Sequence, residues 1–145
     1  MMMKKLSFLA LVVSLAMLFS VNSALSTSFT LNLVGKWEGK LSGIRHSPPN
    51  YEYYANVPLI IRILDQNGNR FYGSASFDGG LSYRAFTGVI SGGKGYITAL
   101  NTVITVEQPF SEGGAWRMAG QMQYWDGSPI IDTGVFTVHR TSTTP

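Results

Sequence analysis

The stretch Ala115 to Tyr124 (AWRMAGQMQY) carries the clearest pattern in the chain. Every second residue is bulky and apolar or is glycine, and most of the residues between them are polar. Side chains of a β-strand point alternately to its two faces, so a period of two predicts a strand with one apolar and one polar face. The apolar face would carry Trp116, Met118, Gly120, Met122 and Tyr124.

The same period of two recurs on both sides of this stretch, and no window of eleven residues keeps the apolar spacing of a helix. Turn sequences such as Asn67-Gly68 and Asp78-Gly79-Gly80 separate several of these segments. Mostly short connections favour antiparallel neighbours. The sequence therefore predicts an all-β fold of eight antiparallel, up-and-down strands, at residues 35–42, 57–64, 70–77, 81–90, 96–100, 102–107, 115–124 and 131–140.

A bulky residue and a glycine stand two positions apart, and so on one face, in several of these strands. Glycine on an inner face lets a strand coil sharply and leaves space that a facing ring can fill. Repetition of this feature around the chain predicts a closed eight-stranded β-barrel, with a two-sheet sandwich as the alternative. The pairs are Trp37/Gly39, Phe71/Gly73, Phe86/Gly88, Met118/Gly120 and Gly134/Phe136.

The first 23 residues have the order of a secretory signal peptide. A basic start with Lys4 and Lys5 precedes sixteen uncharged residues, 6–21, and the small residue Ser23 allows a cut before Ala24. An uncleaved anchor is the alternative, although sixteen residues are short for a membrane span. We expect a signal peptide at 1–23, a lead-in at 24–32, the barrel at 33–140, a flexible tail at 141–145, and a secreted or periplasmic protein.

Composition limits what the domain can do. Charged residues make up 13% of the chain; without Lys4 and Lys5, nine Lys and Arg face eight Asp and Glu, a net charge of +1. This balance gives no basic stripe for a phosphate backbone, so we expect no nucleic-acid partner, and none in the membrane after signal removal. The absence of cysteine excludes disulfides, thiol nucleophiles and Cys-ligated metals. A domain of this size can be stable through core burial alone.

The segment Val34-Gly35-Lys36-Trp37-Glu38-Gly39 resembles the Gly-x-Trp motif that opens lipocalins and avidin-type barrels. The closing segment 134–140 (GVFTVHR) is similar to the last strand of these barrels. The resemblance to lipocalins implies that Arg140 packs across Trp37. It also implies a secreted eight-stranded barrel that holds a small molecule. The chain departs from both families: it has no Thr-Asp-Tyr motif, and the avidin ligand residues have no counterparts, so biotin binding is not implied.

Other motifs predict structure rather than chemistry. Asp132-Thr133-Gly134 looks like the aspartic-protease motif, but too few residues follow it to complete that fold. His46 and His139 are the only histidines, too few for a zinc site, and we expect both at the surface. The segment 91–95 (SGGKG) lies between two strands, so a hairpin turn is expected there instead of a phosphate loop. No catalytic residue, metal or cofactor is predicted.

Two groups of residues are candidates for ligand contact. The connection 43–56 joins the first two strands at one barrel mouth, where the up-and-down topology also brings Asp78 and Asp126. Glu38, Arg62, Arg84, Glu107 and Arg117 are expected to point mostly outward. The predicted interior contacts are Trp37, Phe71, Phe86, Trp116, Met118, Met122 and Tyr124, and the mouth residues are Tyr51, Tyr53, Tyr54 and Trp125.

The sequence is compatible with three different functions. The first is a secreted barrel that binds a small apolar or aromatic molecule, which an empty apolar cavity would favour. The second is a barrel enzyme such as a cyclase, isomerase or hydrolase, which a cavity with a buried polar pair would favour. The third is a surface-interaction or structural protein, which a filled core with an exposed tyrosine patch would favour.

Overall fold

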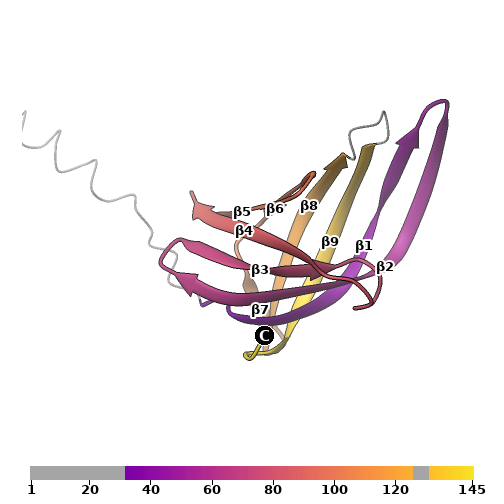
Figure 1. Ribbon diagram of the computed structural model, residues 1–145. Helices are drawn as coiled ribbons and strands as arrows, with labels where there is room; N and C mark the ends of the chain where they lie inside the picture. Colours follow the sequence, from indigo (N-terminus) through magenta and orange to yellow (C-terminus); the bar gives the residue numbers. More distant parts are fainter. Residues whose placement is uncertain (1–31, 126–130) are drawn as a thin grey trace, which may run out of the picture.

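The computed structural model describes residues 32–125 and 131–145 (Figure 1). The predicted signal peptide and all but the last residue of the predicted lead-in lie outside the described residues. Regular structure in the described part is entirely β. The strands are β1 (Gly35–Ser47), β2 (Asn50–Asn67), β3 (Arg70–Ser76), β4 (Arg84–Ser91), β5 (Lys94–Ala99), β6 (Thr102–Val106), β7 (Phe110–Glu112), β8 (Ala115–Trp125) and β9 (Ile131–Ser142).

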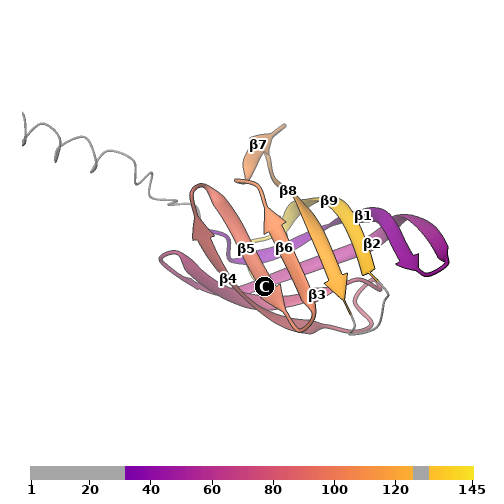
Figure 2. The same ribbon diagram turned by 90° about the horizontal axis from the view of Figure 1, so that it is seen from above.

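The strands close into an antiparallel barrel. Each of β1 to β5 pairs with the next strand along the chain, β6 pairs with β8, β8 pairs with β9, and β9 returns to β1. Eight strands form this ring, whereas β7 pairs with the start of β8 and stands apart from the others in Figure 2. The predicted eight-stranded, up-and-down barrel is confirmed, and the sandwich alternative is wrong.

The first connection is not the loop that the sequence predicted. β1 continues to Ser47 and β2 starts at Asn50, so the segment 43–56 forms a long hairpin around Pro48-Pro49 that extends beyond the barrel body in Figure 1. The β-favouring residues Tyr51 to Tyr54 pair in register with Gly43 to His46. A register shift after Leu41 and the positive φ of Asn56 mark the point where the hairpin leaves the barrel wall.

Several other strand boundaries differ from the prediction, and the clearest cases are β7, β4 and β9. The three-residue strand β7 lies within the predicted loop 108–114. β4 starts at Arg84 rather than at residue 81, because hydrogen bonds to Asp78 hold the preceding residues in a turn. β9 continues to Ser142, two residues into the predicted tail, where the Thr141 hydroxyl donates a hydrogen bond to the Lys36 carbonyl at 3.3 Å.

One end of the barrel is sealed around Trp37, which is 0% exposed. Its indole Nε1 donates a hydrogen bond to the Leu33 carbonyl at 2.9 Å, and the Leu33 amide donates to Oε1 of Gln66 at 2.8 Å. Buried Leu33 therefore forms the floor of the barrel. Arg140 pairs in register with Trp37, and its guanidinium carbon lies 4.7 Å from the ring centroid. The contact predicted from the lipocalin resemblance is confirmed.

Aromatic rings fill the space beside the inner glycines. A Cβ built on Gly88 would lie 2.3 Å from Cζ of Phe71, and one built on Gly73 would lie 2.8 Å from Cζ of Phe86. The two rings meet edge to face with centroids 6.3 Å apart. A cavity among these sealed-end residues measures about 10 Å³, so this half of the interior is solid.

Candidate functional site

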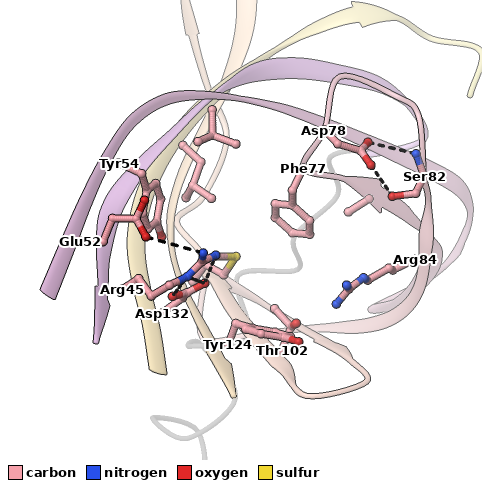
Figure 3. Close-up of a pocket in the computed structure, with 14 residues that line it drawn as sticks. Arg45, Glu52, Tyr54, Phe77, Asp78, Ser82, Arg84, Thr102, Tyr124 and Asp132 are labelled. Atoms are coloured by element: carbon pink, nitrogen blue, oxygen red, sulfur yellow. Dashed lines mark hydrogen bonds and ion pairs between the residues drawn. The ribbon is translucent and has the colours of Figure 1, made fainter. Parts of the chain in front are cut away.

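The opposite end of the barrel holds an open pocket of about 490 Å³ (Figure 3). It lies where β1, β3 and β8 end and where β4, β6 and β9 begin, as the up-and-down topology predicted for the mouth. Its apolar lining is Leu41, Val57, Ala75, Phe77 and Met122. Its polar lining is Arg45, Glu52, Tyr54, Asp78, Ser82, Arg84, Thr102, Tyr124 and Asp132.

A bidentate ion pair joins the first and last strands at the pocket wall. Arg45 of β1 lies opposite Asp132 of β9. The Arg45 Nε donates to Oδ1 at 2.9 Å and its Nη2 donates to Oδ2 at 3.1 Å. Asp132 is 6% exposed, so the guanidinium supplies the partner that a buried carboxylate requires. These hydrogen bonds, followed by the charge of Asp132, raise the pKa of Arg45.

Tyr54 lies beside this pair with its hydroxyl enclosed. Among the described groups the hydroxyl has no hydrogen-bond partner, and burial, followed by the charge of Asp132, raises its pKa. A Cβ built on Gly43 or Gly134 would lie 2.5 or 2.9 Å from that oxygen. The two glycines therefore make the space into which the ring of Tyr54 folds against the wall.

On the other side of the pocket, Asp78 organises the turn between β3 and β4. Its Oδ1 accepts hydrogen bonds from the Ser76 hydroxyl at 2.6 Å and from the amides of Leu81 and Ser82 at 3.0 Å each, and its Oδ2 accepts one from the Ser82 hydroxyl. These donors hold the pKa of Asp78 well below its usual range, and the hydroxyls of Ser76 and Ser82 have the largest effect. The turn is thereby fixed where the chain enters β4.

Arg84 is the first residue of β4 and points into the pocket from its rim (Figure 3). Its guanidinium carbon lies 5.6 Å from the ring centroid of Tyr124. The prediction that Arg84 points outward is wrong. It stands two residues before buried Phe86, so the alternation of β4 turns both side chains inward.

The structure separates the residues predicted to contact a ligand. Met122, Tyr124 and Tyr54 line the pocket. Four others lie in the barrel core rather than on the pocket: Trp37, Phe71, Phe86 and Met118. Trp116 is 37% exposed and pairs with Ser111 of β7 beyond the barrel wall, so it does not line this pocket.

The predicted mouth residues are spread over the rim. Tyr51 and Tyr53 are exposed on the long hairpin, where Tyr51 stacks on His46 with ring centroids 4.4 Å apart. Trp125 is exposed, and its amide donates to the Asn101 carbonyl at 2.9 Å. Asp126 lies outside the described residues.

The sequence places Arg45 in the mouth connection 43–56 without predicting its contact with the pocket, and it does not predict Asp132 or Arg84 as pocket residues. For Asp132 a signal was present, since it continues the inward alternation of Gly134, Phe136 and Val138. Alternation gives no such signal for Arg45, because the pattern predicts a connection after residue 42, whereas β1 continues to Ser47. The predicted structural role of the Asp132-Thr133-Gly134 motif fits its position at the start of β9, with the carboxylate paired to Arg45.

Across residues 32–125 and 131–145, no three His, Cys, Asp or Glu side chains come together as a metal site. The same residues include no helix of the length and apolarity that a membrane span requires. No protein-family model matches the chain, and no curated protein matches it either. The function of this chain is therefore inferred from the pocket itself.

Proposed function

We propose that this protein is an exported binding protein that holds a small molecule in the open half of its barrel. The single observation that carries the proposal is the contrast between the two halves of the interior. One half is solid around Trp37, while the other keeps a pocket of about 490 Å³ lined by five apolar and nine polar or charged side chains. Pockets of this size are typical of sites for small organic ligands, and the polar groups can orient such a ligand.

Two sequence features support this reading. The resemblance of the Gly-x-Trp segment and the closing Arg140 to lipocalin and avidin-type barrels favours a binding function. The order of basic, apolar and small residues in 1–23 favours export to an extracytoplasmic compartment. The closing of one barrel end and the opening of the other give a ligand one route into the interior.

The test compares two alanine-to-leucine variants. Ala75 is buried and lines the pocket, whereas Ala85 is exposed on the outer face of the barrel. We expect the neutral fluorescent probe N-phenyl-1-naphthylamine to bind the parent and Ala85→Leu alike and to bind Ala75→Leu at least about tenfold more weakly, the equivalent of about 1.4 kcal/mol. Equal binding to all three would place the probe elsewhere and contradict the proposal. If Ala75→Leu binds the probe more weakly as expected, mass spectrometry of natively purified protein would identify the natural ligand.

A second candidate function, that of a barrel enzyme, is favoured by one observation. Arg45 and Asp132 form a polar pair at the pocket wall, with the carboxylate buried, which is the feature expected of a catalytic interior. Both oxygens of Asp132 already accept hydrogen bonds from Arg45, so we rank binding first. Conversion of the co-purified ligand by the parent, but not by Asp132→Asn, would reverse that order.

The third candidate, a surface-interaction protein, has less support. Tyr51 and Tyr53 are exposed on the hairpin, but the interior beside them is open rather than filled. A protein that acts through its surface alone has no need of that space.

A further inference from the structure

The charged groups of the pocket differ in how far they are already occupied. Both oxygens of Asp132 accept hydrogen bonds from Arg45. Asp78 accepts hydrogen bonds from two serine hydroxyls and two backbone amides. Glu52, which lies 3.9 Å from Arg45, has a side chain that is 72% exposed and therefore largely hydrated. None of these groups offers a strong, unused interaction to a ligand.

Arg84 is different. Among the described residues it takes part in no ion pair and in no side-chain hydrogen bond; its one recorded partner is the face of the Tyr124 ring. A contact with a ring face leaves the N–H groups of a guanidinium free, and these groups form a planar fork of donors. In Figure 3 the Arg84 side chain extends into the pocket, toward Tyr124 and Thr102.

We propose that the ligand is a small monoanion, an aromatic or aliphatic carboxylate, whose charged group binds the guanidinium of Arg84. This inference rests on the proposed binding function and assigns its ligand class. The planar fork of Arg84 matches the two oxygens of a carboxylate. The apolar body of the ligand would lie against Phe77 and Met122, which line the same pocket.

The charge balance of the lining limits the ligand to one negative charge. Two guanidinium groups, of Arg45 and Arg84, face three carboxylates, of Glu52, Asp78 and Asp132. The Arg45–Asp132 pair cancels locally, and solvent screens the exposed Glu52. Asp78 keeps its charge, but the hydrogen bonds of its own turn occupy its oxygens. Among the described lining residues, Arg84 is thus the one cation without a carboxylate partner, and a second negative charge on the ligand would meet carboxylates without a compensating partner.

Two dyes with the same rings test the proposal. The anion 8-anilino-1-naphthalenesulfonate carries a sulfonate that N-phenyl-1-naphthylamine lacks, so the pair isolates the charged group. We expect the parent to bind the anionic dye more tightly, and Arg84→Gln to weaken anionic-dye binding by about tenfold or more. The affinity for the neutral dye should change by less than about twofold in that variant, since no hydrogen bond to a charged group is lost. A rise in ionic strength should weaken the binding of the anionic dye and leave the binding of the neutral dye unchanged.

Arg62→Gln is the matched control, because Arg62 also lies over a tyrosine ring, 4.4 Å from the centroid of Tyr83, but is absent from the pocket lining. It should leave both dyes unaffected, and thermal unfolding of each variant checks that it is folded. If the parent binds the neutral dye and Arg84→Gln binds the anion as tightly as the parent does, the monoanion proposal is overturned while the binding function stands. If the parent binds neither dye, both proposals fail.

Discussion

The guanidinium of Arg140 lies over the ring of Trp37, 4.7 Å from its centroid, across the pairing of the first and last strands. Arg140 also donates a hydrogen bond to the Asn32 carbonyl, and the indole of Trp37 donates to the Leu33 carbonyl. Two side chains thus connect the N-terminal segment, β1 and β9 at the sealed end. Burial lowers the pKa of Arg140, but an arginine so placed keeps its charge.

We expect Trp37→Ala to cost about 3–5 kcal/mol of unfolding free energy, because it opens a cavity in a fully buried site and removes the donor to Leu33. Urea unfolding measures the loss. Trp116→Ala is the control, since Trp116 is 37% exposed and should cost about 1 kcal/mol or less. Equal losses of unfolding free energy in the two variants would contradict the role of Trp37 at the barrel closure.

Gly88→Ala should destabilise the barrel by about 1–3 kcal/mol, because the new Cβ would lie 2.3 Å from Cζ of Phe71. Adding Phe71→Leu should recover part of that loss, since the shorter side chain vacates the space. Gly95→Ala serves as the control, because its Cβ would lie 3.4 Å from the nearest atom of Val106. No recovery in the double variant would show that the backbone, not the ring, sets the cost.

Gly120→Leu should also destabilise the protein, by about 1–3 kcal/mol or more, rather than fill an empty pocket. A Cβ at residue 120 would lie 2.4 Å from the Thr105 carbonyl oxygen and 2.6 Å from Cζ of Phe136. Thermal unfolding checks this expectation. A variant that melts with the parent would mean that the interior beside Gly120 is looser than the structure has it.

Asp78 should make part of the stability depend on pH. Its folded-state pKa lies below the unfolded value of about 3.9, so the stabilisation is complete above that value and declines as the pH falls below it. Asp78→Asn removes this titration, and its unfolding midpoint in urea should fall less than that of the parent between about pH 5 and pH 2. Parallel pH profiles for the two proteins would contradict the assignment.

We expect the exported protein to start near Ala24, because the small residue Ser23 follows the apolar segment 6–21. N-terminal sequencing of protein recovered from the extracytoplasmic fraction measures this directly. Recovery of a chain that still carries Met1 would support the anchored alternative.

Periodicity predicted most of the fold. All eight barrel strands were found, because alternation depends only on which residues face inward and is preserved along a strand. Boundaries depended on local contacts that alternation does not show. Hydrogen bonds to Asp78 delay the start of β4, and the pairing of Tyr51 to Tyr54 with β1 turns a predicted loop into a hairpin.

The pocket was harder to predict, because aromatic content does not distinguish filled space from open space. Phe71 and Phe86 fill the space left by inner glycines, so they belong to the core. Trp116 continues the inward pattern of β8, but β8 extends past the barrel there and pairs with β7. Charged residues were expected outside, although the alternation that placed Phe86 inside also placed Arg84 there.

The pairing of β1 with β9 has a consequence for how the chain is made. One edge of β1 can acquire its hydrogen bonds from β2 early, but its other edge must wait for residues 131–142, the last strand to be synthesised. Contacts so distant in sequence form slowly, since a long loop must close before they stabilise anything. A growing chain therefore cannot complete the barrel before residues 131–142 have been synthesised.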